Sequence, residues 1–114
     1  MANPEHLEIL KRGVEVWNKF REGRLRDMFD LSHAHLQELN LSFANLSFAE
    51  LRKTNLHDAN LSFADLSNAD LYRSNLYNAV LDYAKLSNAD LSLANLIAAD
   101  FTGAEVFGLD LSEA

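Results

Sequence analysis

The sequence predicts an all-β repeat protein, a solenoid of stacked coils that follows one N-terminal α-helix. Leucine returns at every fifth residue from Leu31 to Leu96. The stretch NLSFANLSFAE, which begins at Asn40, returns in altered form at residues 60, 80 and 100. Residues 3–22, in contrast, carry apolar side chains at steps of three and four. A period of twenty indicates one turn of a solenoid, and the shorter spacing indicates an amphipathic helix.

Residues 3–22 are predicted to form the helix. Asn3 is a favoured N-cap, Pro4 suits the first helical position, and Gly23 is placed to end the last turn. Residues 24–27 are predicted to form a short polar turn, so residues 1–28 make up a helix-and-turn segment and residues 29–114 make up the repeats. The apolar stripe of the helix must cover another surface. It is formed by Leu7, Leu10, Val14, Trp17 and Phe20.

The repeat places an apolar residue at the centre of each five-residue unit. Ala stands two residues before most of these central residues, and Asn or Asp usually stands one residue before. Five residues suit neither a helix nor a long strand, but they suit a short strand plus a corner. The central residues are Leu31, Leu36, Leu41, Leu46, Leu51, Leu56, Leu61, Leu66, Leu71, Leu76, Leu81, Leu86, Leu91, Leu96, Phe101, Val106 and Leu111.

This pattern, A-[DN]-L-x-x, resembles the signature of the pentapeptide-repeat family over about 85 of the 114 residues. The resemblance implies a right-handed, quadrilateral parallel β-helix with one pentapeptide on each side and four in each coil. The seventeen units would give about four coils. In such a coil the central residue and the small residue two before it point inward. Each buried leucine then stabilises the fold by about 1.5–3 kcal/mol.

The helix is expected to cap the N-terminal end of the stack. Phe29 and Leu39 are large inward residues at positions where later coils carry Ala, and we expect them to meet the helix. Their predicted contacts are Leu7, Leu10, Val14 and Trp17. The stretch NPEHLEILKRGVEVWN resembles helices that precede the repeats in bacterial, notably cyanobacterial, members of the family.

The last coil departs from the pattern of small and polar residues. Phe101, Val106, Phe107, Leu109 and Leu111 gather there, and we expect this coil to be a contact surface. Two explanations stay open. The coil pairs with a second copy in a homodimer, or the natural chain continues beyond Ala114.

Two columns of outward side chains are predicted from the period of twenty. Phe43, Phe63 and Tyr83 form an aromatic column, which either docks a partner or shields the turns by stacking. The second column is acidic, with Asp30 below Glu50, Asp70, Asp90 and Asp110. These carboxylates either accept hydrogen bonds from turn amides or form a negative stripe. The family resemblance implies a use for such a stripe, because some members bind type II topoisomerases in place of DNA. Arg52, Lys53 and Arg73 would partly neutralise it.

No motif points to catalysis. Thr54 and Ser74 are predicted to be stacked inward hydroxyls, with no base beside them. His33 and His35 could present two imidazoles to one metal ion, but a third ligand is missing. The chain has no cysteine and no phosphate-binding glycine loop. We expect no enzyme activity, no cofactor, no metal site and no small-molecule substrate.

Charge and hydropathy narrow the class of partner. The net charge of −7 argues against direct nucleic-acid binding, which needs clustered Lys and Arg. No apolar run approaches the roughly 20 residues of a membrane span, and the first residues lack a secretory signal pattern. We therefore expect a cytoplasmic bacterial protein that binds a protein partner and not a membrane.

Three function classes follow. The main interpretation is a non-enzymatic structural or protein-interaction module that binds its partner through the solenoid faces or the C-terminal coil. One alternative is a DNA-mimicking inhibitor of DNA gyrase or another type II topoisomerase, which a supercoiling assay would test. The other is a scaffold or localisation region of a larger multidomain protein, which the reading frame beyond Ala114 would test.

Overall fold

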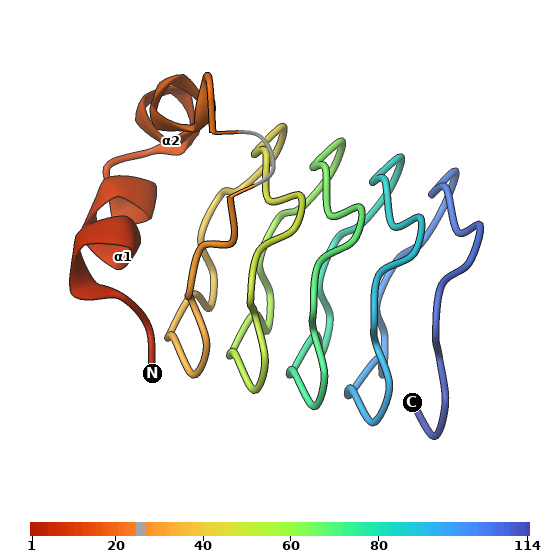
Figure 1. The fold of residues 1–114 in the computed structure, drawn as a ribbon. Coiled ribbons are helices and arrows are strands. Elements are labelled where there is room, and N and C mark those ends of the chain that lie inside the picture. Colours follow the sequence, from red (N-terminus) through yellow and green to blue (C-terminus); the bar gives the residue numbers. More distant parts are fainter. Residues whose placement is uncertain (25–26) are drawn as a thin grey trace.

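The computed structural model describes residues 1–24 and 27–114, and it consists of two short helices followed by a stack of coils. Figure 1 shows the chain leaving the helices and advancing coil by coil to the C-terminus at the far end of the stack. The molecule measures 32 × 23 × 20 Å along its principal axes. The N-terminal residues lie beside the first coil, where the backbone N–H of Asn3 donates to the carbonyl of Asp30 at 2.7 Å.

The prediction of one N-terminal helix is wrong, because this segment forms two helices. Helix α1 spans Pro4–Lys11 and helix α2 spans Val14–Arg21. Gly13 separates them with φ at +120°, a conformation outside the helical range that glycine adopts at little cost. Asn3 caps α1 as expected from its residue type, with Oδ1 accepting from the N–H groups of Glu5 and His6. The predicted turn at residues 24–27 includes residues 25–26, which lie outside the described residues.

The coils are joined by parallel hydrogen bonds between residues twenty positions apart. Among the described residues, thirteen bridges run from the pair Asp30 and Glu50 to the pair Asp90 and Asp110. Around Asn60, for example, its carbonyl accepts from the N–H of Leu41 at 2.7 Å and its own N–H donates to the carbonyl of Leu39 at 3.0 Å. Residues twenty apart are therefore neighbours in successive coils.

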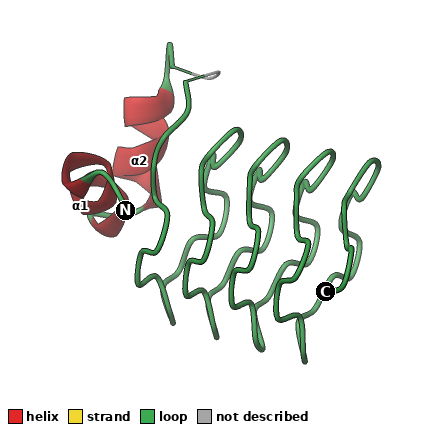
Figure 2. Ribbon diagram, turned by 60° about the horizontal axis from the view of Figure 1, so that its bottom comes forward, coloured by secondary structure: helices red, strands yellow, loops and turns green. Residues whose placement is uncertain are grey.

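Within the described residues, the sides of each coil are single-residue bridges and not continuous strands. Figure 2 accordingly draws the whole stack as loop and turn. The prediction of a hydrogen-bonded solenoid thus agrees with the structure, but the described coils contain no extended strands. Each side of a coil is too short for a strand, because the corner takes up most of the five residues.

Each corner is a tight turn whose third residue has a left-handed backbone. At the corner after Leu41, Phe43 has φ at +65° and the N–H of Ala44 donates to the carbonyl of Leu41 at 3.1 Å. Turns of type II require a positive φ at this position. The same geometry recurs every five residues along the stack, mostly at residues other than glycine. The side chain of the third residue lies outside the coil at these corners.

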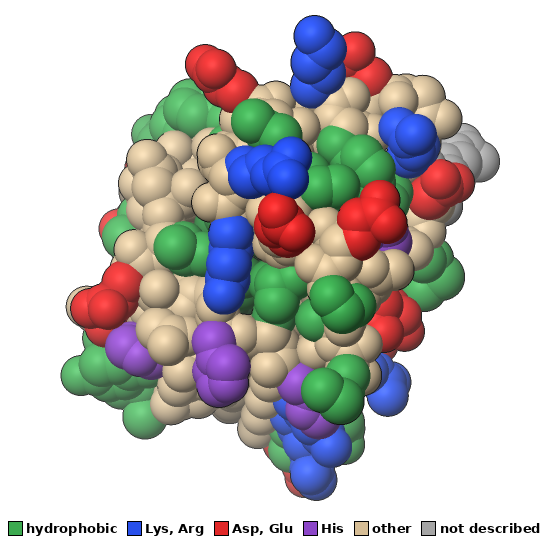
Figure 3. All heavy atoms as spheres, turned by 90° about the vertical axis from the view of Figure 1, so that its left-hand side faces the viewer, with side chains coloured by type: hydrophobic (Ala, Val, Ile, Leu, Met, Phe, Trp, Pro, Cys, Tyr) green, Lys and Arg blue, Asp and Glu red, His purple; other side chains and the backbone are tan. Residues whose placement is uncertain are grey.

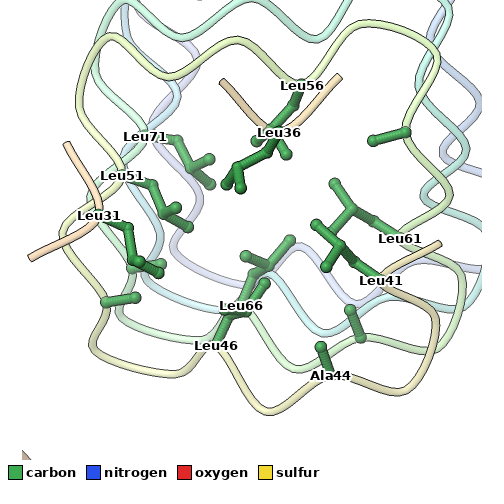
Figure 4. Packing of buried hydrophobic residues seen from close by; sticks show 14 of the residues in the cluster. Leu31, Leu36, Leu41, Ala44, Leu46, Leu51, Leu56, Leu61, Leu66 and Leu71 are labelled. Atoms are coloured by element: carbon green, nitrogen blue, oxygen red, sulfur yellow. The ribbon is translucent and has the colours of Figure 1, made fainter. Parts of the chain in front are cut away.

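The interior of the stack is filled by leucine and small residues (Figure 4). The buried small residues include Ala44, Ala64 and Ala84, which succeed one another in neighbouring coils. The central leucines that are at most 2 % exposed are Leu31, Leu36, Leu41, Leu46, Leu51, Leu56, Leu61, Leu66, Leu71, Leu76, Leu81, Leu86 and Leu91.

The central residues of the last coil are not buried to the same degree. Leu96 and Phe101 are partly buried, whereas Val106 and Leu111 are each 50 % exposed. The expectation that Val106 and Leu111 belong to the core is therefore wrong for the described chain. An inward side chain is buried by the coils on both sides of it, and no described residue stacks beyond these two.

Two hydroxyl groups lie in the interior. Thr54 Oγ1 donates to the carbonyl of Leu51 at 2.8 Å, so its polar group is satisfied. Ser74 is 1 % exposed, and its Oγ has no hydrogen-bond partner among the residues that the structure describes. The two hydroxyls lie in successive coils but differ in their environment.

Candidate functional site

The aromatic column is a stack of three rings on one corner of the solenoid. The ring centroids of Phe43 and Phe63 are 5.0 Å apart with planes inclined by 4°, and those of Phe63 and Tyr83 are 5.1 Å apart with planes inclined by 13°. All three rings stay about half exposed. Coil spacing sets this geometry, because the same corner recurs one coil higher.

Gly103 ends the aromatic column. A Cβ atom added to Gly103 would lie 2.6 Å from Cε1 of Tyr83, so the ring of Tyr83 already covers this glycine. The backbone at Gly103 has φ at +68°, like the other corners. A larger residue there would displace the ring of Tyr83.

The acidic column supplies hydrogen-bond acceptors to its own turns. The Oδ1 atoms of Asp30, Asp70, Asp90 and Asp110 each accept from the backbone N–H two residues later, at 2.9–3.1 Å. Glu50, whose side chain is longer, makes no such bond among the described residues. This geometry provides a local reason for Asp at these positions.

Serine and threonine hydroxyls favour the ionised form of two carboxylates of the acidic column, Asp30 and Asp110, and of Asp100 at another turn. Hydrogen bonds from the hydroxyl and then from the N–H of Thr102 lower the pKa of Asp100, and those of Ser112 lower the pKa of Asp110. Burial acts against ionisation at Asp30, but the bonds from Ser32 outweigh it and lower the pKa of Asp30. These groups resist protonation in the folded protein.

One carboxylate of the acidic column, that of Asp70, forms an ion pair with an arginine. Arg52 Nε lies 2.5 Å from Oδ2 of Asp70, and this hydrogen bond raises the pKa of Arg52. The guanidinium of Arg52 also lies 5.0 Å from the ring centroid of Tyr72, and that of Arg73 lies 5.4 Å from the same ring. The acidic column is therefore flanked by cations and an aromatic ring.

Helix α2 is joined to the first coil by side chains that bond to its backbone edge. Trp17 Nε1 donates to the carbonyl of Asn45 at 2.7 Å. Arg21 donates from Nη1 to the same carbonyl and from Nη2 to the carbonyl of Ser47, both at 2.9 Å. Asn18 Oδ1 accepts from the N–H of Asn45, and its Nδ2 donates to the carbonyl of Phe43.

Arg21 and Asn18 are the contacts that sequence reasoning missed. Arg21 is fully buried, and its guanidinium lies 4.5 Å from the ring centroid of Phe29. Burial lowers the pKa of Arg21, while the carboxylates of Asp65 and Asp27 act in the opposite direction. Arg21 lies four residues after Trp17 and therefore on the same buried face of α2. This spacing is the sequence feature that could have predicted its burial.

The residues expected at the contact between helices and repeats lie around this point. Leu10, Trp17 and Phe29 are buried, with ring centroids of Trp17 and Phe29 5.5 Å apart. Leu7, Val14 and Leu39 are partly buried against the same core. Phe20 and His6 also contact the ring of Phe29, with centroid distances of 5.4 and 4.9 Å.

The other end of the stack exposes apolar side chains. Phe107 is 83 % exposed, and Ile97, in the same coil, is 67 % exposed. Leu109 is partly buried. Ala94, Leu96, Ile97 and Ala114 line a shallow depression at this end.

His33 and His35 line a groove between α1 and the first coil, which has a volume of about 340 Å³. In residues 1–24 and 27–114 no group of three or more His, Cys, Asp or Glu side chains is placed to hold a metal ion. Neither helix has the length and apolar composition needed to cross a membrane, as judged over the described residues.

Comparisons with known proteins agree with the repeat pattern. The family model for pentapeptide repeats matches in eight copies, over residues 30–62, 40–76, 54–92 and 74–112. No curated protein matches the chain.

Two solved structures from cyanobacteria share the fold and about a third of the sequence. The pentapeptide repeat protein alr5209 from Nostoc PCC 7120 is 32 % identical, with a TM-score of 0.59, over 86 % of this chain and 94 % of that one. Rfr23 from Cyanothece 51142 is 33 % identical, with a TM-score of 0.53, over 75 % of this chain and 61 % of that one. The matching repeats, the coil geometry and these likenesses show that the chain belongs to the pentapeptide-repeat family.

Proposed function

We propose that this chain is a non-enzymatic protein-interaction module whose C-terminal coil binds a second copy of the same protein. Membership of the pentapeptide-repeat family supports a non-enzymatic repeat protein. The observation that carries the choice of surface is the exposure of Phe107, at 83 % of its side chain and backbone area. Exposed apolar side chains that gather on one surface favour a protein contact.

The backbone of the last coil supports the same choice. In the preceding coil the N–H of Leu81 donates to the carbonyl of Asp100, and that of Leu86 donates to the carbonyl of Glu105. The corresponding N–H groups of Phe101, Val106 and Leu111 have no acceptor among the described residues. Unpaired edges of this kind favour association with another chain.

The proposal assigns the two helices a complementary role as a cap on a right-handed stack of about four coils. Its support is the set of bonds from Trp17, Asn18 and Arg21 to the backbone edge of the first coil. Because the helices cover most of the first coil and no described residue covers the last one, self-association through the last coil gives a closed two-fold dimer and not an open filament.

Sedimentation over a range of protein concentrations tests the proposal. We expect a reversible dimer, which Phe107→Ser converts to a monomer. Tyr77→Ser is the matched control, because Tyr77 is also an exposed aromatic residue, 46 % exposed, on a side of an earlier coil. A wild-type protein that stays monomeric at the highest concentration, or a dimer that Phe107→Ser leaves intact, would contradict the proposal.

A further inference from the structure

The basic side chains of the repeats gather at one corner of an acidic solenoid. From Phe29 to Ala114 the chain has four basic and twelve acidic residues, a net charge of −8. Three of the four basic residues are Arg52, Lys53 and Arg73. Lys53 lies at the same corner as His33 but one coil higher, and Arg73 lies at that corner two coils higher. We call His33, Lys53 and Arg73 the basic corner.

The two cations of the basic corner, Lys53 and Arg73, are available to a partner. Lys53 and Arg73 are exposed, and neither forms an ion pair among the described residues. Asp70, the carboxylate of the neighbouring column, is instead paired with Arg52. Cations stacked in successive coils repel one another, so an anionic group bound between Lys53 and Arg73 would relieve that repulsion.

Tyr72 holds the guanidinium of Arg73 in place. That guanidinium lies 5.4 Å from the ring centroid, and the guanidinium of Arg52 lies 5.0 Å from the same centroid. Cation–π contacts of this kind restrict an otherwise mobile side chain. A restricted cation loses less conformational entropy when it binds a carboxylate.

The basic corner leads into the groove between α1 and the first coil. His33 belongs to both, and Lys11 of α1 adds a cation to the groove. Pro4, Leu7 and Ala34 supply apolar lining. The volume of about 340 Å³ lies near the lower end of the range of roughly 300–1,000 Å³ for ligand sites. The groove therefore has room for a short length of chain and not for another coil.

Unpaired backbone groups line this groove. The N–H of His35 and the carbonyls of Ser32 and His35 make no hydrogen bond within residues 1–24 and 27–114. One coil later the equivalent groups are all paired, since Asn55 N–H donates to the carbonyl of Ala34, and the carbonyls of Arg52 and Asn55 accept bonds from the first coil. An extended peptide can satisfy such an edge by adding to it as a strand.

We propose that the basic corner and this groove together bind an acidic, extended segment of a partner protein. Its backbone pairs with the edge at Ser32 and His35, and its carboxylates contact Lys53 and Arg73. The mixed charge of the N-terminal end, where His side chains gather along one edge (Figure 3), supports a short peptide. A nucleic acid would extend beyond this patch onto a surface with a net charge of −8, which repels phosphates.

The test is fluorescence anisotropy with a labelled peptide of alternating Glu and Val residues, and with its Gln and Val counterpart. We expect saturable binding of the acidic peptide, no binding of the Gln peptide, and weakening with salt. The double variant Lys53→Gln/Arg73→Gln should weaken binding by about tenfold. The control Lys19→Gln/Lys85→Gln removes the same charge elsewhere and should change binding by less than about twofold.

Hydrogen exchange tests the backbone part of the proposal. Bound peptide should slow exchange of the His35 amide, which has no acceptor in the free protein. Equal effects of the two double variants, unchanged exchange at His35, or equally tight binding of single-stranded DNA or anionic vesicles would each overturn the proposal. The C-terminal coil is a separate surface, so this proposal does not depend on the proposed dimer.

Discussion

The Nη2 atom of Arg21 lies 2.9 Å from the carbonyl oxygen of Ser47, and this bond replaces one that a preceding coil would make. One coil later the equivalent carbonyl, that of Ser67, accepts from the backbone N–H of Phe48. Asn45 follows the same rule, because its carbonyl accepts from Trp17 and Arg21 while the carbonyl of Asp65 accepts from Leu46 N–H. Side chains of α2 thus continue the hydrogen-bond pattern of the solenoid.

Arg21→Met should therefore destabilise the protein although it removes a buried charge. The variant keeps much of the apolar contact with Phe29 but leaves the carbonyl of Ser47 without its donor. We expect the free energy of unfolding to fall by about 1–3 kcal/mol, measured by urea denaturation. Lys19→Met is the control on the exposed face of α2. Equal stability of the two variants would refute the role given to Arg21.

The aromatic column should contribute to stability through ring stacking. Phe43 and Phe63 are stacked with centroids 5.0 Å apart. A double-mutant cycle with Phe43→Ala and Phe63→Ala should give a coupling energy of about 0.5–1.5 kcal/mol. Strictly additive losses would show that the rings meet only because coil spacing places them together.

The family and the solenoid could be predicted from sequence, because every unit repeats the same spacing of leucine, small and polar residues. The break between α1 and α2 was harder to predict, since the apolar stripe continues from Leu10 to Val14 across it. Gly13 marks the break, but a single glycine is also tolerated inside helices. The burial of Arg21 was also hard to predict, because its charge favours the polar face of the helix although its spacing from Trp17 puts it on the buried one.

The interior hydroxyl of Ser74 should cost stability. Its Oγ is buried and has no partner among the described residues, whereas Thr54 Oγ1 bonds to the carbonyl of Leu51. Ser74→Ala should raise the free energy of unfolding by about 0.5–2 kcal/mol, and Thr54→Ala should lower it. Thermal and urea unfolding of both variants measure this. A loss of stability in Ser74→Ala would indicate that the hydroxyl finds a partner in solution.

Acid should weaken the stack through its turn carboxylates. Hydrogen bonds from Thr102 and Ser112 lower the pKa values of Asp100 and Asp110 in the folded protein. Their contribution is fully present above the unfolded pKa, about 3.9, and is lost as the pH falls through the lower folded values. The urea concentration at the midpoint of unfolding should therefore decrease as the pH is lowered below about 4.

Asn can accept the same turn hydrogen bond as Asp, but its side chain does not titrate. At Asn60, for example, Oδ1 accepts from the N–H of Ser62 at 3.0 Å. The variant Asp100→Asn/Asp110→Asn should keep the turns and show a shallower loss of stability in acid. Urea titrations of both proteins across this pH range make the comparison. Superimposable pH profiles would exclude these two carboxylates as the cause.

Disulfide trapping tests most directly the central claim that the chain closes one coil every twenty residues. The chain has no cysteine. Ser67 and Ser87 lie in adjacent coils, where Asn68 N–H donates to the carbonyl of Ser87 at 3.0 Å. A coil spacing of roughly 4.8 Å falls within the Cα separations of about 4.4–6.8 Å that disulfides span. Ser67→Cys/Ser87→Cys should form an intramolecular disulfide under mild oxidation, and Ser67→Cys/Ser92→Cys, which is offset by one side, should not. Equal cross-linking of both pairs, or of neither, would contradict the twenty-residue coil.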